Sequence, residues 1–215
     1  AQAAARLLAD PAFVAPGQPA AAAALARGTA FHQVLQHLDW RIEPTEEAVA
    51  RALDDLVASG RLAADARQQV RLADICRFLR HPLAQRLRQA RRVWREQPFY
   101  LRLPAGAPGA PPEHSVIVQG VIDCLAEEAD GWLVVDYKTD EVTEAEAPRR
   151  AAAYHAQVAA YREAVRAATG AARVEAFVYF VGPGAAFPVP AVDLAAVWRA
   201  ASARAEAAGT EEECV

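Results

Sequence analysis

Methionine is absent from this sequence, and lysine is almost absent. None of the 215 residues is methionine, not even the first, so we expect the chain to be a piece of a longer polypeptide. The three cysteines are widely spaced and form no Cys-x-x-Cys pair, which disfavours a zinc ribbon or iron–sulfur site and favours reduced thiols. No apolar run reaches the roughly 18 residues of a membrane span, and no signal peptide is visible. We therefore expect a cytoplasmic protein without a membrane segment.

The composition is that of an ordinary globular protein, with 53% hydrophobic and 23% charged residues. The net charge of -4 argues weakly against a nucleic-acid partner. Arginine, however, is clustered in two places, which are Arg86, Arg88, Arg91, Arg92 and Arg95, and then Arg149 and Arg150. Such clusters are either a solvated face or a track for phosphates, and the clusters alone do not decide between the two.

The first half of the chain has the periodicity of helices. Residues 1–20 are rich in proline and predict a linker or arm. Helices are expected over 22–39, from Thr45 to about Gly60, and over 63–80, followed by a short one. We interpret 21–90 as a helical part that precedes a core over 91–208, with a flexible tail at 209–215.

The pattern changes to that of strands after residue 90. Strands are predicted over 91–103, 115–128, 132–138 and 174–181, and helices over 148–169 and 191–207. The order β-β-β-α-β predicts an α/β fold with a central mixed sheet flanked by helices.

Three charged residues converge on the hairpin formed by the second and third strands. If Asp130-Gly131 is its turn, Asp123 lies opposite Lys138; if Ala129-Asp130 is the turn, Asp123 lies opposite Asp136. Either register predicts the two aspartates and the lysine on one face. Two close carboxylates repel each other unless a cation lies between them, and hard oxygen ligands suit Mg²⁺ or Mn²⁺. The hairpin therefore predicts a metal site.

Lys138 is the only lysine in the chain, and the other 22 basic residues are arginine. A compact ammonium can approach a scissile phosphate or an attacking water more closely than a broad, planar guanidinium. The alternative is a structural Asp–Lys ion pair at the end of a strand. We favour the metal site because a buried strand ends in a charge, a second aspartate faces it, and the lysine is unique.

These residues resemble a known family. The segments G-V-I-D (120–123) and V-V-D-Y-K-T-D (134–140), followed by a helix, resemble the RecB-like branch of the PD-(D/E)xK nuclease superfamily. Upstream, ARGTAFHQVLQHLD (26–39) resembles the helix that supplies the family's histidine, and REQPFYL (95–101) resembles its E-x-P-F strand. VQGVIDCL is similar to the AddA-type helicase–nucleases in particular. The resemblance covers about 22–182 and implies a restriction-endonuclease-like fold.

The resemblance also implies the roles of individual residues. His32, Asp123 and Asp136 would bind the metal together with the backbone carbonyl of Tyr137. Lys138 would position or activate the attacking water. The metal would be Mg²⁺, with Mn²⁺ as a substitute.

Three further residues receive roles from the same resemblance. Gln157 and Tyr161, which share a helix face, would line the site and contact DNA. Glu96 is expected to support the site or contact DNA rather than to bind the metal.

The function that the resemblance implies is a Mg²⁺-dependent exonuclease that cuts single-stranded DNA, with the 3′-ended strand as substrate, during double-strand break repair. The helicase motor would belong to the same polypeptide and be missing here, and an AddB-type protein would be the partner. Two alternatives stay open. The chain could be a stand-alone nuclease of the same superfamily, or a catalytically silent domain that holds DNA in the same complex.

Overall fold

The structure is a computed structural model that describes residues 19–104 and 115–201. The predicted tail at 209–215 and nearly all of the predicted arm at 1–20 lie outside these residues. Among the helices described, none combines the length and hydrophobicity needed to cross a lipid bilayer.

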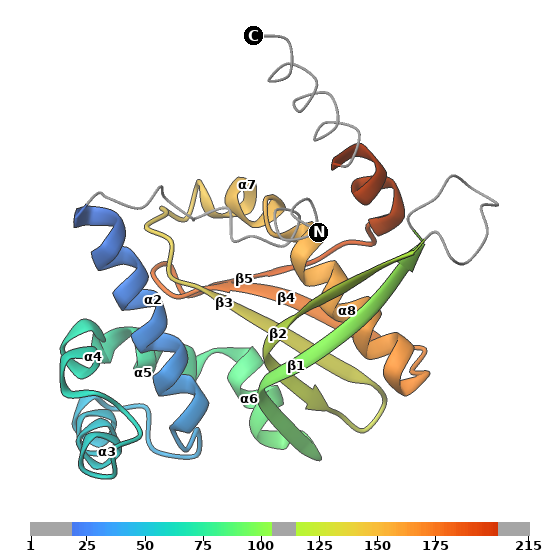
Figure 1. The fold of residues 1–215 in the computed structure, drawn as a ribbon. Coiled ribbons are helices and arrows are strands. Elements are labelled where there is room, and N and C mark those ends of the chain that lie inside the picture. Colours follow the sequence, from blue (N-terminus) through green and yellow to red (C-terminus); the bar gives the residue numbers. More distant parts are fainter. Residues whose placement is uncertain (1–18, 105–114, 202–215) are drawn as a thin grey trace, which may run out of the picture.

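The first half of the described chain is helical, as predicted, but it contains five helices where four were expected (Figure 1). They are α2 (Pro19–His37), α3 (Glu46–Ala58), α4 (Ala64–Gln69), α5 (Leu72–Arg80) and α6 (Pro82–Gln89). The predicted start of α3 is confirmed, because the hydroxyl of Thr45 accepts a hydrogen bond from the backbone N–H of Ala48 at 3.3 Å.

The single helix predicted over 63–80 is wrong. The chain leaves the helical conformation at Val70 and Arg71, which separate α4 from α5. Val70 is buried, and Arg71 donates a hydrogen bond to the Asp74 carboxylate at 2.9 Å in the first turn of α5. These contacts fix the break, while the apolar periodicity continues through it, so the pattern alone does not reveal it.

The second half builds a five-stranded sheet in the order β1-β2-β3-β4-β5. The strands are β1 (Arg92–Pro104), β2 (Ser115–Glu127), β3 (Trp132–Lys138), β4 (Val174–Phe180) and β5 (Ala185–Pro188). The pair β3–β4 is parallel and the other pairs are antiparallel, so the predicted mixed sheet is confirmed. The short β5 was not predicted, because its four residues show no clear alternation.

Helices cover both faces of the sheet, and each face has its own hydrophobic core (Figure 1). One core joins α2, α3, α5 and α6 to the sheet, and the other joins it to α7 (Ala147–Ala152) and α8 (His155–Thr169). The helix predicted over 148–169 is interrupted at Ala153 and Tyr154, where a turn places the tyrosine in the second core. Of the last predicted helix, over 191–207, residues 194–201 are helical, residues 191–193 are not, and residues 202–207 lie outside the described part of the chain.

The alternation of β1 and β2 reverses where Glu96 lies opposite Asp123. Ile122 belongs to the core beneath α8, whereas Cys124, two residues later, belongs to the core beneath α5. Glu96 has φ 53°, and it is the only non-glycine residue with positive φ among those described. Ladder pairs Arg95–Cys124 and Gln97–Ile122 flank this point. Because of this reversal, the far ends of β1 and β2, beyond Glu96 and Asp123, pack the opposite set of side chains against α8.

Candidate metal centre

The candidate site lies where β2 separates from β3. Their ladder runs from Glu127–Trp132 to Cys124–Val135 and goes no further, so the turn is centred on Ala129-Asp130, the second of the two expected registers. Beyond the last pair, the Asp123 carboxylate accepts a hydrogen bond from the backbone N–H of Tyr137 at 2.8 Å. The side chain of Asp123 thus replaces a ladder bond and is fixed between the two strands.

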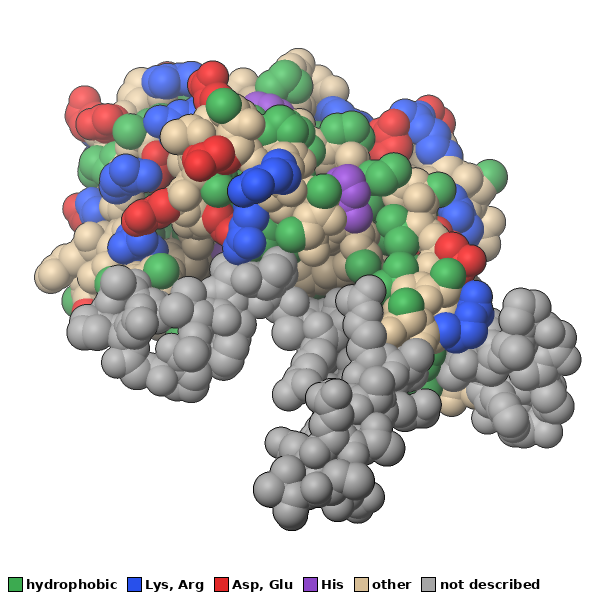
Figure 2. Space-filling model, turned by 90° about the horizontal axis from the view of Figure 1, so that it is seen from above, with side chains coloured by type: hydrophobic (Ala, Val, Ile, Leu, Met, Phe, Trp, Pro, Cys, Tyr) green, Lys and Arg blue, Asp and Glu red, His purple; other side chains and the backbone are tan. Residues whose placement is uncertain are grey.

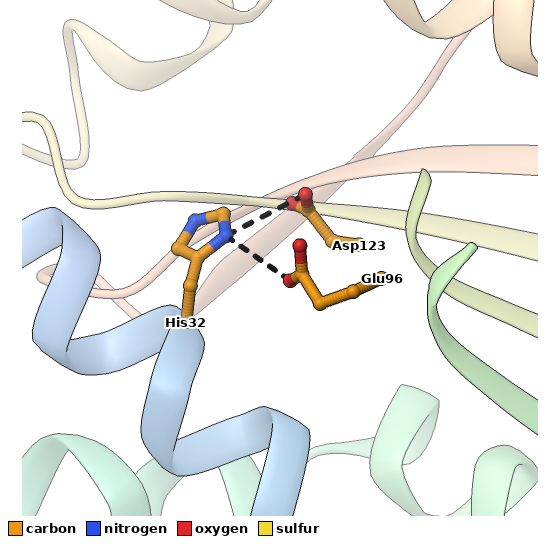
Figure 3. Close-up of side chains that lie close together, drawn as sticks. All are labelled: His32, Glu96 and Asp123. Atoms are coloured by element: carbon orange, nitrogen blue, oxygen red, sulfur yellow. Dashed lines mark ion pairs between the residues drawn. The ribbon is translucent and has the colours of Figure 1, made fainter. Parts of the chain in front are cut away.

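His32 reaches this fork from helix α2 (Figure 3). Its Nδ1 lies 3.5 Å from Asp123 Oδ1 and 3.8 Å from Glu96 Oε1, while its Nε2 lies 3.1 Å from the carbonyl oxygen of Tyr137. Gly28, one turn earlier, permits this approach, because a Cβ there would lie 3.0 Å from the hydroxyl of Thr139. The helix therefore places the predicted histidine beside the predicted aspartate and the predicted carbonyl.

Glu96 is closer to the site than the sequence suggested. Glu96, His32 and Asp123 offer ligand atoms that all lie within 4.8 Å of one another, a spacing that one ion can bridge with small side-chain movements. The E-x-P-F segment was the available signal for Glu96. What the sequence did not show is the backbone reversal at this residue, which directs its carboxylate toward the histidine (Figure 3).

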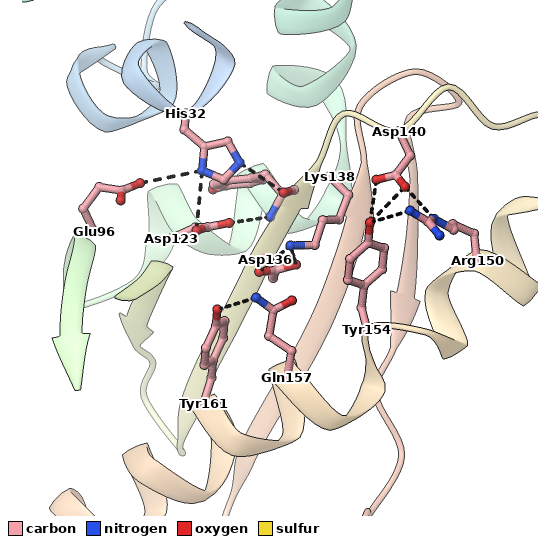
Figure 4. Close-up of polar contacts among 11 residues, drawn as sticks. His32, Glu96, Asp123, Asp136, Lys138, Asp140, Arg150, Tyr154, Gln157 and Tyr161 are labelled. Atoms are coloured by element: carbon pink, nitrogen blue, oxygen red, sulfur yellow. Dashed lines mark hydrogen bonds and ion pairs between the residues drawn. The ribbon is translucent and has the colours of Figure 1, made fainter. Parts of the chain in front are cut away.

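Asp136 and Lys138 form a buried ion pair on the other side of β3 (Figure 4). Their side chains are 1% and 6% exposed, and Lys138 Nζ lies 3.1 Å from Asp136 Oδ2. The ammonium also lies 4.5 Å from the centre of the Tyr154 ring. The charges of Asp136 and Lys138 both act on the Asp123 carboxylate, so the three charged residues of the hairpin are neighbours. The ion pair is turned toward Tyr154, and Asp123 is in contact with His32.

The electrostatics of the fork favour a cation. Burial raises the pKa of Asp123 to about 7, and the charge of Asp136 acts in the same direction, although His32 and Lys138 oppose it. Burial lowers the pKa of His32, but Asp123 and Glu96 outweigh this effect and raise it to about 9. The carboxylates thus hold the imidazole protonated at neutral pH. The site carries more negative charge than its burial favours, and its carboxylate and carbonyl oxygens fit Mg²⁺ or Mn²⁺. The imidazole of His32 could join these oxygens as a ligand once it has lost its proton.

Gln157 and Tyr161 lie on the face of α8 that looks toward the Asp136–Lys138 pair (Figure 4). The amide of Gln157 donates to the hydroxyl of Tyr161 at 3.0 Å, and the Tyr161 ring packs edge-on against Phe99. The Oε1 atom of Gln157 is buried and has no hydrogen-bond partner among the described residues. It is therefore an acceptor that a bound ligand could use.

Most of the first arginine cluster holds the fold together. Arg86 pairs with Glu128 and Glu175, Arg88 donates to backbone carbonyls, and Arg95 stacks 3.8 Å from the centre of the Trp40 ring. Arg91 and Arg92 are the exposed members. On the face shown in Figure 2, basic and acidic side chains are interspersed rather than gathered into one basic patch.

The fold and the site together define a restriction-endonuclease-like α/β domain with a candidate metal centre. A family model described as the PD-(D/E)XK nuclease superfamily matches residues 2–213, and the chain belongs to this superfamily. The segment Asp136-Tyr137-Lys138 has the residue types and spacing of the (D/E)XK in that description.

Curated relatives that are named as subunits of an ATP-dependent helicase/nuclease, of the AddA type, are similar to this chain. The relative from Moorella thermoacetica is 38% identical over 186 residues, 83% of this chain and 13% of the relative. That from Alkaliphilus oremlandii is 34% identical over 157 residues, 71% of this chain and 13% of the relative. That from Heliobacterium modesticaldum is 50% identical over 117 residues, 53% of this chain and 8% of the relative. The matches therefore span about a tenth of the length of these relatives.

Proposed function

We propose that this chain is the nuclease domain of an AddA-type helicase–nuclease and hydrolyses phosphodiester bonds of single-stranded DNA with Mg²⁺. The helical part at 21–90 and the core at 91–208 would act as one catalytic domain, because α2 supplies His32 to a site built by the sheet. The observation that carries the proposal is the convergence of His32, Glu96 and Asp123 beside the buried Asp136–Lys138 pair.

The donor atoms of His32, Glu96 and Asp123 would hold the ion, with Asp136 and the carbonyl of Tyr137 next to them. When bound, the ion supplies Lewis acidity toward the scissile phosphate and the attacking water. Glu96 enters this ligand set because of its position, in place of the supporting role expected from the sequence.

The other residues act on the substrate. Lys138 provides an ammonium that stabilises negative charge developing near the nucleophile, and Asp136 fixes its position at 3.1 Å. Gln157 and Tyr161 would contact the DNA strand from the α8 side, where the buried amide oxygen of Gln157 is available. Arg149 would contact a phosphate, since its side chain is exposed to solvent.

The relatives' names and lengths support the biological setting that we propose. A helicase motor would occupy the rest of the polypeptide and deliver the strand, and an AddB-type protein would complete the complex. The 3′-ended strand of a double-strand break would be the substrate, and the complex would work in the bacterial cytoplasm at the nucleoid. This setting favours a part of a larger machine over a stand-alone nuclease.

The second candidate is a catalytically silent domain that binds DNA in the same complex. A degenerate domain of this kind is expected to lose the lysine or an aspartate, and this chain has Asp123, Asp136 and Lys138 at one site.

The test is cleavage of 5′-labelled and 3′-labelled oligonucleotides in Mg²⁺, Mn²⁺ or EDTA. We expect metal-dependent cutting of single strands by the chain, and at least a roughly 100-fold loss in Asp136→Asn and Lys138→Ala. Asp55→Asn, an exposed carboxylate on α3, is the matched control and should cut like the unmodified chain. Binding of oligonucleotides without cutting in either metal would contradict the proposal and support the silent domain.

A further inference from the structure

A second polar network lies behind Lys138, on the side away from His32 (Figure 4). It consists of Asp140, just after β3, Arg150 on α7, and Tyr154 at the turn between α7 and α8. None of these residues belongs to the ligand set of the proposed metal centre. The network nevertheless touches the site, because the ring of Tyr154 contacts the ammonium of Lys138.

The hydroxyl of Tyr154 is held at several points. It lies 2.9 Å from each carboxylate oxygen of Asp140 and accepts a hydrogen bond from Arg150 Nη2 at 3.2 Å. Arg150 Nε in turn donates to Asp140, and this bond raises the pKa of the guanidinium against the opposing effect of burial. Asp140 is itself largely buried, with a side chain that is 8% exposed. The three groups therefore form one closed unit with little freedom to move.

The ring of Tyr154 forms one wall of the space that contains the Lys138 head group. Tyr154 is 0% exposed, and its ring centre lies 4.5 Å from Nζ, a distance at which an ammonium is attracted to the ring face. The Asp136 carboxylate holds the same ammonium at 3.1 Å. Lysine has a long, flexible stem, so two contacts in different directions restrict its head group far more than one.

We propose that Tyr154, fixed by Asp140 and Arg150, is a positioning residue that sets where the Lys138 ammonium lies. The inference rests on the proposed nuclease function, because Lys138 is the group whose position matters for that reaction. Because two charged side chains hold its hydroxyl, the ring of Tyr154 has a fixed orientation toward the ammonium. Arg150 is thereby assigned to the interior of the site, whereas its neighbour Arg149 faces solvent.

The first test detects the position of the Lys138 side chain by NMR and does not depend on DNA cleavage. Because Lys138 is the only lysine, lysine labelled with ¹³C at Cε gives one NMR resonance from the full chain. We expect the ring current of Tyr154 to shift the attached protons upfield, Tyr154→Phe to keep this shift, and Tyr154→Leu to remove it. Arg150→Gln should change the resonance and Arg149→Gln should not. An unshifted resonance in the unmodified chain, or no change in Tyr154→Leu, overturns the inference even if the chain cuts DNA.

The second test measures the steady-state kinetics of cleavage. A misplaced catalytic group can cost about 100-fold in rate, so we expect kcat to fall about 10- to 100-fold in Tyr154→Leu while KM changes less than about twofold. Tyr154→Phe and Arg150→Gln should fall by less, and Arg51→Gln, which replaces an exposed arginine on α3, should keep the kcat of the unmodified chain. These two milder variants preserve the test if Tyr154→Leu does not fold.

A double-mutant cycle separates positioning from packing. In a Lys138→Ala background, Tyr154→Leu should add less than about twofold to the loss, because its effect passes through the missing ammonium. Tyr179→Leu removes an equally buried tyrosine from the other core. Its fold-loss in rate should multiply with the fold-loss of Lys138→Ala, because it does not act through the ammonium. If the losses of Tyr154→Leu and Lys138→Ala multiply, Tyr154 does not act through Lys138. An unmodified chain without nuclease activity contradicts the proposed function, and the NMR result still decides the positioning.

Discussion

Replacing Lys138 with methionine should destabilise the metal-free protein strongly, although methionine preserves most of the side-chain volume. Asp136 is 1% exposed and Lys138 6%, and their charged atoms lie 3.1 Å apart. Removing one partner leaves a charge buried without its counterion, which costs about 3–5 kcal/mol of unfolding free energy. For a domain of this size, about 2–4 °C of melting temperature correspond to 1 kcal/mol. The midpoint should therefore fall by about 6–20 °C.

The double variant Asp136→Leu/Lys138→Met should recover most of this loss. Exchange of a buried ion pair for apolar groups of similar volume is often neutral, so we expect a stability within about 1 kcal/mol of the unmodified chain. The two single variants and the double variant form a cycle whose coupling free energy reports the pair directly.

The assay is urea and thermal unfolding followed by circular dichroism in EDTA, so that no divalent ion replaces the missing charge. Arg149→Met, which removes an exposed charge on α7, is the control and should change stability by less than about 0.5 kcal/mol. If Lys138→Met costs less than about 1 kcal/mol, or if the double variant loses as much as the two single variants added together, the pair is not the desolvated unit described here.

Three further predictions concern metal binding, measured by calorimetry with Mn²⁺. Glu96→Gln should weaken binding at least about tenfold, and an unchanged affinity would remove Glu96 from the ligand set. Affinity should rise between pH 6 and pH 9, because ligands must lose their protons to bind and the pKa values of Asp123 and His32 are raised to about 7 and about 9; a flat profile would contradict this. Gly28→Ala should weaken Mn²⁺ binding, because its Cβ would lie 3.0 Å from the Thr139 hydroxyl, while α2 stays folded because alanine favours a helix. An affinity equal to that of the unmodified chain would show that α2 need not lie so close to Thr139.

The fold class followed from the sequence because each strong pattern has a direct physical cause. Alternation and the turn residues located β2 and β3, and their register was narrowed to two possibilities, of which the Ala129-Asp130 turn is realised. The breaks at Val70 and at Tyr154 were missed. In both cases the apolar period continues through the break. At Val70 the local contact of Arg71 with Asp74 accompanies the break, and at Tyr154 the contact with Asp140, before α7, does so. The spacing of apolar residues in the sequence carries no information about such polar contacts.

Arginine was harder to interpret than lysine for the same reason. Three of the five clustered arginines contact groups distant in the sequence, such as the pair of Arg86 with Glu128 and the contact of Arg95 with the carbonyl of Leu38. Arginines that are neighbours in the sequence therefore do not form one basic patch on the surface. The contact of Lys138 with Asp136 was easier to anticipate, because the two residues lie two positions apart in the same strand, whereas the contact with Tyr154 was not.

Glu96 shows where reasoning from alternation reaches its limit. Regular alternation would have continued β1 and β2 with one face on the same core throughout. The positive φ of Glu96 instead exchanges the faces of the ribbon and directs a carboxylate toward His32 and Asp123. Non-glycine residues adopt this backbone conformation at an energetic cost, which the surrounding structure must offset. The strain lies at the one point of the ribbon where three candidate ligands meet. We therefore interpret it as a requirement of the proposed site, because the candidate ligand set and the change of face involve the same residue.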